Sequence, residues 1–273
     1  MGFMAAKTVL VTGATGGIGL EASRALARQG ARVLVGARDT ARGQAVVESI
    51  RGDGGLADLL VVDLASFASI REAAARTVAA HPILDVLVNN AGTAQRQRRL
   101  TADGHELTWQ TNYLGGFLLT RVLLPALRAA ERPRVINVAS EAHRSGRIDF
   151  GNLELEHGYR PYRAYSNTKL AQVLFTRELA RREPGIAVNA VHPGVIATGI
   201  WRPAPGWMRG LARILFASPE KGAAPVVRLA SDPALEGISG RYFDRFREAA
   251  PSETARDDPD GRRLWEISEK AVG

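Results

Sequence analysis

A tyrosine and a lysine stand four positions apart in the segment AYSNTKLAQ, residues 164–172. If this segment is helical, positions i and i+4 share one face, so the ammonium of Lys169 lies one turn from the phenol of Tyr165. A free phenol has a pKa of about 10 and is a poor base at neutral pH, but a neighbouring cation stabilises the phenolate and lowers that pKa. The pair could therefore act as a general acid and base, although a Y-x-x-x-K spacing also occurs by chance on many helix surfaces.

A second candidate site is the glycine-rich stretch TGATGGIG, residues 12–19. It follows the strand-like run KTVLVT and precedes an amphipathic, helix-like segment that ends near Gly30. Glycine at such a turn lets the main chain approach a diphosphate, whose charge is met by free N–H groups and the positive end of the helix. This context favours a dinucleotide over a tight connection alone. The residues expected to contact it are Gly13, Thr15, Gly16, Gly17, Ile18 and Gly19.

The elements that must position these residues follow from six short apolar runs rich in valine, isoleucine and leucine. They occupy residues 7–12, 31–37, 58–63, 84–90, 134–140 and 186–192. Continuously apolar runs are typical of strands covered on both faces, and amphipathic segments lie between them. This alternation predicts an α/β fold, a doubly wound parallel sheet with helices on both faces. No linker divides the chain, so we expect a single domain over residues 1–273.

The segment GIWRPAPGWMRGLARILFA, residues 199–217, breaks this alternation and is expected to form a lid on the substrate side. Its apolar residues could line a pocket for a bulky substrate, with Trp201 and Trp207 as candidate contacts. They could equally pack on the core, or form a surface helix that touches lipid or a partner.

Composition excludes several classes of function. The net charge is +8, but only four of the basic residues are lysines, and the one tight cluster, Arg96, Arg98 and Arg99, has no interleaved aromatic residues. A scattered bias of this kind does not predict nucleic-acid binding. The chain has no cysteine, and its five histidines lack ligand spacing, so we expect no metal site and a cytoplasmic setting. The amino terminus does not read as a signal or a membrane anchor.

Further motifs extend the pattern along nearly the whole chain, and together they resemble the short-chain dehydrogenases/reductases. The glycine spacing is G-x-x-x-G-x-G. The other matching residues and motifs are Asp63, NNAG at 89–92, Asn112, Ser140, Tyr165 with Lys169, and HPGVIAT at 192–198. The resemblance implies a Rossmann-like fold and an oxidoreductase that interconverts a carbonyl and an alcohol by hydride transfer.

The resemblance also implies the catalytic set. Tyr165 would exchange a proton with the substrate oxygen, and Lys169 would tune that tyrosine while holding the nicotinamide ribose. Ser140 would hydrogen-bond the substrate oxygen, so Ser140 and Tyr165 are also expected substrate contacts. Asn112 would kink its helix and support a water-mediated proton relay to the lysine.

The implied cofactor is NADP(H), with NAD(H) as the alternative. An acid at the end of the second strand would bind the NAD ribose, but Ala37 takes that place and Arg38 follows it, with Arg42 as a second cation. Gly16 stands where many NADP-using relatives carry a base, so exclusive preference does not follow. The other implied cofactor contacts are Asp63, Leu64, Asn90, Ala91, Gly92, Tyr165, Lys169, Pro193, Gly194, Ile196 and Thr198.

The segment between Ser140 and Tyr165 is long, and with SNTKLAQVLFTRELA it resembles the retinol dehydrogenase and WW-domain oxidoreductase branch. Retinoid-handling members usually carry an amino-terminal anchor. We therefore expect the substrate to be an apolar small-molecule carbonyl or alcohol other than retinal. The family commonly pairs through helices corresponding to residues 107–130 and 165–182, which implies a homodimer or homotetramer. A non-catalytic module that senses the nucleotide is the competing hypothesis.

Overall fold

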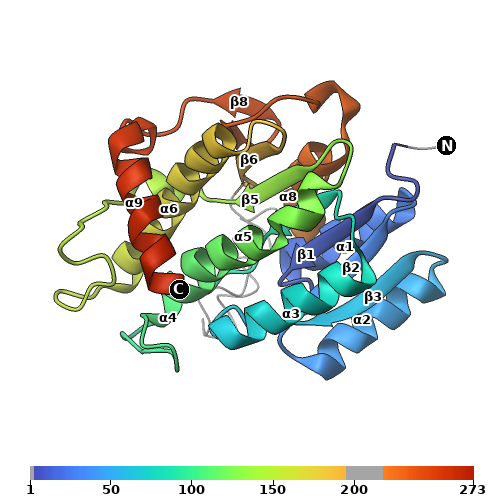
Figure 1. Cartoon of the computed structure of the whole chain (residues 1–273), viewed down its shortest axis with the longest axis horizontal. Helices are drawn as coiled ribbons and strands as arrows, with labels where there is room; N and C mark the ends of the chain where they lie inside the picture. The colour runs from blue at the N-terminus through green and yellow to red at the C-terminus, as the bar shows by residue number, and fades with distance from the viewer. Residues whose placement is uncertain (1–2, 195–217) are drawn as a thin grey trace.

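The computed structural model describes residues 3–194 and 218–273 of the chain, which form one sheet with helices on both faces (Figure 1). The strands are β1 (Thr8–Thr12), β2 (Arg32–Ala37), β3 (Leu56–Val61), β4 (Val86–Asn89), β5 (Arg134–Val138), β6 (Ala187–His192), β7 (Arg241–Asp244) and β8 (Arg247–Ala249). The α-helices are α1 (Gly17–Arg28), α2 (Thr40–Gly52), α3 (Phe67–Ala80), α4 (Leu107–Trp109), α5 (Gly115–Arg128), α6 (Pro161–Arg182), α8 (Pro219–Ser231) and α9 (Asp258–Val272). A π-helix, η1 (Gln110–Leu114), and three 3-10 helices, η2 (Glu141–Ser145), η4 (Pro233–Leu235) and η5 (Thr254–Arg256), complete the described elements.

The strand order places a natural binding crevice in the middle of the sheet. The order is β3-β2-β1-β4-β5-β6-β7-β8, with every neighbouring pair parallel except β7 and β8. The chain builds outward from β1 to β3, then returns to add β4 on the other side of β1. Ligands of such sheets bind outside the carboxyl ends of the strands where this reversal occurs.

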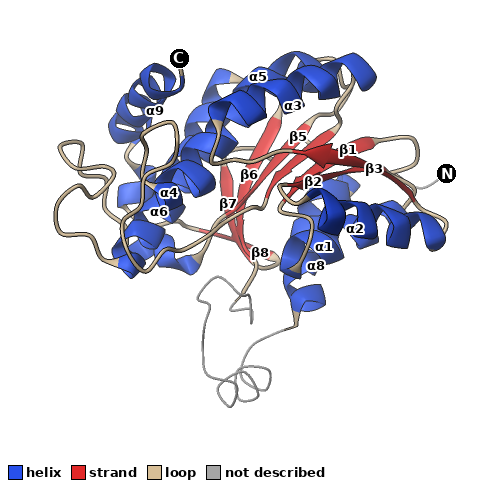
Figure 2. Ribbon diagram, turned by 90° about the horizontal axis from the view of Figure 1, so that it is seen from below, coloured by secondary structure: helices blue, strands red, loops and turns tan. Residues whose placement is uncertain are grey.

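Two hydrophobic cores lie on opposite faces of the sheet because successive strand residues point to opposite sides. On β1, Leu10 packs with Phe117 and the residues of α3, α5 and α6. Val9 and Val11 pack on the other face with α1, α2 and α8, as Figure 2 shows. The predicted doubly wound α/β fold is therefore confirmed, and the six predicted strands are found with their ends shifted by a few residues.

The two last strands were missing from the sequence interpretation, which ended the alternation near residue 192. β7 and β8 have four and three residues, and β8 has charged, exposed positions at the edge of the sheet. Neither is long enough to show a period, and a short, charged edge strand is a known way to avoid unwanted pairing.

Helix α9 covers the side of α5 and α6 that faces away from the sheet (Figure 1). The Trp265 ring lies 4.9 Å from that of Phe117 and 5.9 Å from that of Phe175, measured between centroids. Arg121 on α5 forms an ion pair with Glu269 on α9. The helices implied for subunit pairing are thus partly covered by the chain's own last helix, and a homodimer or homotetramer stays a prediction.

Candidate active site

The glycine-rich turn between β1 and α1 has little room for side chains. Gly13 and Gly17 have φ of 65° and 56°, in the region that favours glycine. A Cβ at Gly19 would lie 2.4 Å from the Asn90 amide nitrogen and 2.5 Å from the Gly13 carbonyl oxygen. The N-cap of α1, Gly16, supplies no side-chain hydrogen bond, and the first turn of the helix contains no acidic residue. The turn therefore offers unclaimed N–H groups and the positive end of a helix to an anion.

This packing predicts that Gly19→Ala destabilises the fold and weakens dinucleotide binding together. We expect a loss of about 1–3 kcal/mol in unfolding free energy, because a methyl group must displace main chain in a filled space. NADPH affinity should fall at least about tenfold, measured by fluorescence titration beside a denaturant melt. The control is Gly52→Ala at the end of α2, where a Cβ meets nothing within 4 Å. Unchanged stability and affinity in Gly19→Ala would contradict the packing argument.

The segment after β4 forms the other wall of the crevice. Thr12 at the end of β1 accepts hydrogen bonds at its hydroxyl from the main-chain N–H groups of Asn90 and Ala91, at 3.0 and 3.1 Å. The Asn90 amide donates to the Thr12 carbonyl at 2.8 Å. A Cβ at Gly13 would be 2.9 Å from the Ala91 Cα. The predicted residues of TGATGGIG and NNAG are thus brought together, except that the Ile18 side chain is buried in the core and only its main chain could contact a ligand.

Two arginines lie beside this turn, at the carboxyl end of β2. Arg38 follows β2 directly and is exposed, and Arg42 donates from its guanidinium to the Thr15 carbonyl at 3.2 Å. The intervening Asp39 accepts from the Arg42 main-chain N–H at 3.0 Å as the N-cap of α2. The Asp39 carboxylate is therefore engaged in capping, while the Arg42 guanidinium lies against the glycine-rich turn.

Asp63 and Leu64 lie just beyond the end of β3. The Asp63 carboxylate accepts from the Ala65 N–H at 3.0 Å, and its own N–H donates to the Ser69 hydroxyl at 3.0 Å. Leu64 is buried, and its carbonyl oxygen would be only 2.5 Å from a Cβ at Gly115. These local bonds fix both residues at the carboxyl edge of the sheet, where cofactor contacts were predicted.

Asn112 lies in the π-helix η1, where the wider turn distorts the helix that leads into α5. Its side-chain oxygen accepts from the Thr93 N–H at 2.7 Å, and its amide donates to the Thr93 carbonyl and the Thr168 hydroxyl at 2.9 and 3.1 Å. The predicted helix distortion is present. The side chain is fully engaged in joining the segment after β4 to α6.

A glutamine links Asn112 to Lys169 directly. The Gln172 amide donates to the Asn112 carbonyl oxygen at 2.7 Å, and its own oxygen accepts from the Lys169 ammonium at 2.9 Å. The Gln172 side chain thus spans the gap between the Asn112 main chain and the Lys169 ammonium. The water-mediated relay through Asn112 stays a prediction.

Ser140 and Tyr165 meet at the carboxyl end of β5. Ser140 follows this strand, its hydroxyl accepts from the Ala142 N–H at 3.2 Å, and it lies close enough to the Tyr165 phenol to act on the pKa of that phenol. Tyr165 projects from the first turns of α6. Burial raises the pKa of Tyr165, an effect that the hydrogen bond from Ser140 opposes and the neighbouring Tyr162 reinforces. Two hydroxyl groups are thus placed to contact the same substrate oxygen.

Lys169 is 4% exposed, and its ammonium lies 5.4 Å from the centre of the Tyr165 ring. It donates to the Val138 carbonyl at 2.8 Å as well as to Gln172. Burial lowers the pKa of Lys169 to about 7, so the cation is half neutralised near neutral pH. Burial penalises the charged form of both groups, and the lowering of the Tyr165 pKa by Lys169 stays a prediction.

The loop after β6 begins with Pro193 and Gly194, and Gly194 has φ of 97°. A conformation of this kind favours glycine and turns the chain sharply at the start of the loop that was predicted to contact the cofactor. Ile196, Thr198, Trp201, Trp207 and the predicted lid at 199–217 lie outside the described residues.

Sequence reasoning missed three side chains that act on this site. Gln172 could have been found, because it stands three residues after Lys169 and so shares its helix face. Thr168 stands directly before Lys169. Its role was hidden in the sequence because its partner, Asn112, lies 56 positions away. His143, which contacts the Ser140 carbonyl, had no visible signal because its other partner, Ser252, is 109 positions away.

Comparisons with known proteins agree with this geometry. Residues 7–208 match the family described as short chain dehydrogenase. Retinol dehydrogenase 14 of Homo sapiens is 39% identical over 295 residues, covering 100% of this chain and 88% of that protein. Polyprenol dehydrogenase of Mus musculus is 44% identical over 274 residues, covering 95% and 82%.

Solved structures show the same relationship. A putative uncharacterized protein from Mycobacterium paratuberculosis is similar at a TM-score of 0.82 and 31% identity, covering 100% of this chain and 95% of that one. A putative NAD(P)-dependent gluconate 5-dehydrogenase from Beutenbergia cavernae, with bound NADP at low occupancy, has a TM-score of 0.71 and 32% identity, covering 88% and 95%.

The fold and the site define a nicotinamide-dinucleotide oxidoreductase, and the chain belongs to the short-chain dehydrogenase/reductase family. Within that family it lies in the retinol dehydrogenase-like branch.

No helix among residues 3–194 and 218–273 is both long and apolar enough to cross a membrane. In the same ranges, no group of three or more histidine, aspartate or glutamate side chains could hold a metal ion.

Proposed function

We propose that the protein interconverts an apolar ketone or aldehyde with its alcohol, with NADP(H) as the preferred cofactor. The observation that carries this proposal is the meeting of Ser140, Tyr165 and Lys169 at the carboxyl end of the sheet, beside the uncapped glycine-rich turn. The bound dinucleotide would supply and accept the hydride. The glycine cradle fits such a group, because Gly13 and Gly19 have no room for a Cβ and α1 has no side-chain cap.

The side chains divide the remaining chemistry. Ser140 and Tyr165 hold the substrate oxygen with two hydroxyl groups, which stabilises the negative charge that develops there during reduction. Tyr165 then donates its proton to that oxygen, and in the reverse direction it accepts the proton of the alcohol. Lys169, held by Val138 and Gln172, is positioned beside the phenol to stabilise the phenolate once it forms.

Preference for NADP(H) is supported by the cations at the mouth of the crevice. Arg38 follows β2 and is exposed, Arg42 contacts the glycine-rich turn, and the nearby Asp39 carboxylate is engaged as a helix cap, so both arginines are candidates to bind the 2′-phosphate of NADP. A phosphate gains from charge-assisted hydrogen bonds that a ribose hydroxyl cannot form.

Arg42→Ala is expected to raise the Kd for NADPH about tenfold or more and to leave the Kd for NADH within about twofold. A charge-assisted hydrogen bond contributes about 1.5–3 kcal/mol, and only NADPH carries the phosphate. Calorimetric titration of both cofactors measures the ratio. Arg262→Ala, an exposed arginine on α9, is the control. Equal weakening of both cofactors, or of neither, would argue against a phosphate contact at Arg42.

An apolar substrate is supported by the names of the relatives, which are a retinol and a polyprenol dehydrogenase. Both names denote long apolar alcohols.

The proposal is tested by screening apolar ketones, aldehydes and alcohols against NADPH and NADH and following absorbance of the reduced nicotinamide. Reduction of at least one apolar carbonyl compound, faster with NADPH, supports it. Tight NADPH binding with no turnover across the panel would favour the nucleotide-sensing alternative. The cytoplasmic setting stays a prediction.

A further inference from the structure

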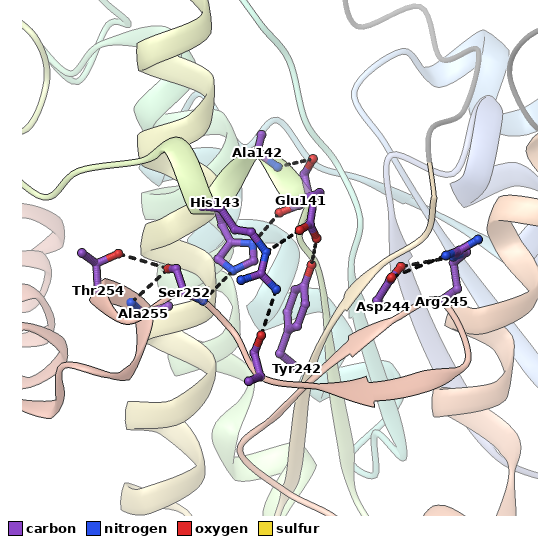
Figure 3. Close-up of polar contacts among 12 residues, drawn as sticks. Glu141, Ala142, His143, Tyr242, Asp244, Arg245, Ser252, Thr254 and Ala255 are labelled. Atoms are coloured by element: carbon purple, nitrogen blue, oxygen red, sulfur yellow. Dashed lines mark hydrogen bonds and ion pairs between the residues drawn. The ribbon is translucent and has the colours of Figure 1, made fainter.

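The turn that follows the catalytic serine contains a histidine with no role in the chemistry above. His143, in η2, is 0% exposed. Its Nδ1 lies 2.8 Å from the Ser140 carbonyl oxygen, and its Nε2 accepts from the Ser252 main-chain N–H at 3.1 Å. Figure 3 shows the ring between the β5 end of the sheet and the segment after β8. One imidazole thus joins the main chain at Ser140 to the main chain at Ser252, which lies 109 residues after the histidine.

These two partners permit only one form of the ring. A carbonyl oxygen can only accept and a main-chain N–H can only donate, so Nδ1 must carry the proton and Nε2 must be bare. The imidazolium form would place an N–H against the Ser252 N–H. Burial of the ring is the largest influence on the pKa of His143 and lowers it, which agrees with a ring kept neutral. The tautomer is therefore set by main-chain groups on both sides.

The same turn is held by two further contacts to the carboxyl-terminal part of the chain. The buried Tyr242 on β7 donates its hydroxyl proton to the Glu141 carboxylate at 3.0 Å. Arg144 donates to the Ala250 carbonyl at 2.9 Å and pairs with Glu141. Three side chains of η2, from Glu141, His143 and Arg144, thus attach it to the segment 242–252, and Figure 3 shows the contacts of Glu141 and His143. Of these contacts, only the one through His143 reaches the Ser140 main chain itself.

We propose that His143 is a positioning residue for the proposed reaction, and that its neutral imidazole fixes the main chain of Ser140 against Ser252. The Ser140 carbonyl accepts both the His143 N–H, at 3.1 Å, and the ring Nδ1–H. These two bonds fix the direction of the Ser140 peptide, and with it the direction in which the hydroxyl points toward Tyr165. A shift of about 1 Å at such a group is enough to slow chemistry about 100-fold while substrate still binds. The inference rests on the proposed function.

Acid should release this contact. The charged groups that face the ring are Glu141 and Arg144 on its own turn and His192 on β6, and the Tyr242 ring packs against it from β7 at 4.7 Å. Because the pKa is lowered, the ring takes up a proton only below the usual range near 6.5. The neutral form is present above that range and is lost as the pH falls through the lowered value, so kcat should fall on the acid side.

The test compares His143→Ala and His143→Asn with His157→Asn, which changes an exposed histidine in the neighbouring loop. We expect His143→Ala to lower kcat at least about tenfold, with KM and the Kd for NADPH within about twofold. His143→Asn, whose amide can still donate to the Ser140 carbonyl, should recover part of this loss and should lack the acid decline of the parent. His157→Asn should match the parent.

A second measurement on the unmodified protein keeps the inference testable if the variants fail to fold. Histidine-selective nitrogen NMR should show one ring protonated at Nδ1 that stays neutral below pH 6.5. A parent-like kcat in His143→Ala, equal losses in kcat and cofactor affinity, or a ring protonated at Nε2 would overturn the proposal. If turnover depends on Tyr165 but not on His143, only this inference fails. If turnover is independent of Tyr165, the proposed function fails while the NMR result still reports on the contact.

Discussion

Tyr165→Phe is expected to lower kcat about 1000-fold while the Kd for NADPH stays within about threefold of the parent value. The substitution removes one oxygen atom, and with it the proton that Tyr165 is proposed to donate to the substrate oxygen beside the Ser140 hydroxyl. General acid–base groups contribute about 10²–10⁴-fold to rates, so the loss should be near the middle of that range. Steady-state kinetics with the best substrate of the panel, beside calorimetric titration with NADPH, measures both quantities.

Tyr162→Phe is the matched control. Tyr162 stands one turn earlier on α6 and is 53% exposed, so the same atom is removed from an exposed neighbour whose one described effect on Tyr165 is to raise its pKa. Its kcat should stay within about twofold of the parent value. A loss in Tyr165→Phe no larger than the loss in Tyr162→Phe would remove the phenol from the mechanism.

Lys169→Met should lower kcat about 100-fold or more without a matching loss of stability near pH 7. Methionine fills a similar volume and needs no hydration, so it removes the cost of burying a charge. The acceptors at Val138 and Gln172 lose their donor, which costs about 1–3 kcal/mol and offsets that gain. A large drop in activity with a nearly unchanged denaturation midpoint would separate function from folding.

The same variant gives a distinct pH signature. The pKa of Lys169 is about 7 in the folded protein and near 10.5 when unfolded, so between pH 7 and 9 the unfolded chain binds more protons. The unfolding free energy of the parent should therefore rise with pH in this window relative to that of Lys169→Met, by up to about 1.4 kcal/mol per pH unit. Parallel stability curves for the two proteins would show that the lysine is not buried as the structure has it.

The fold could be predicted from the sequence because its strongest signals are local. Buried parallel strands read as continuous apolar runs, and six of them with intervening helices leave few topologies. β7 and β8 could not be predicted, because Arg241–Asp244 and Arg247–Ala249 are too short and too charged to carry a period. They are strands only because β6 offers an open edge.

The site residues that carry motifs were also visible in the sequence, and the structure gathers the described ones at one edge of the sheet. Their electrostatics were not visible. A spacing of four residues predicts that Lys169 lies beside Tyr165, but the pKa values depend on burial, which for Lys169 is beside Val138 of β5 and Gly92 of the segment after β4. Long-range partners were equally hidden, since neither His143 nor Ser252 belongs to a recognisable motif.

Transfer of deuterium from NADPH labelled at C4 of the nicotinamide tests the central claim most directly. The purified protein is mixed with the labelled cofactor and an apolar carbonyl compound from the panel, and the product is examined by mass spectrometry and NMR. We predict one deuterium on the carbinol carbon of the alcohol, formed rapidly by the parent and about 1000-fold more slowly by Tyr165→Phe. Tightly bound NADPH with no labelled alcohol from any compound, or equal labelling by both proteins, would contradict the account.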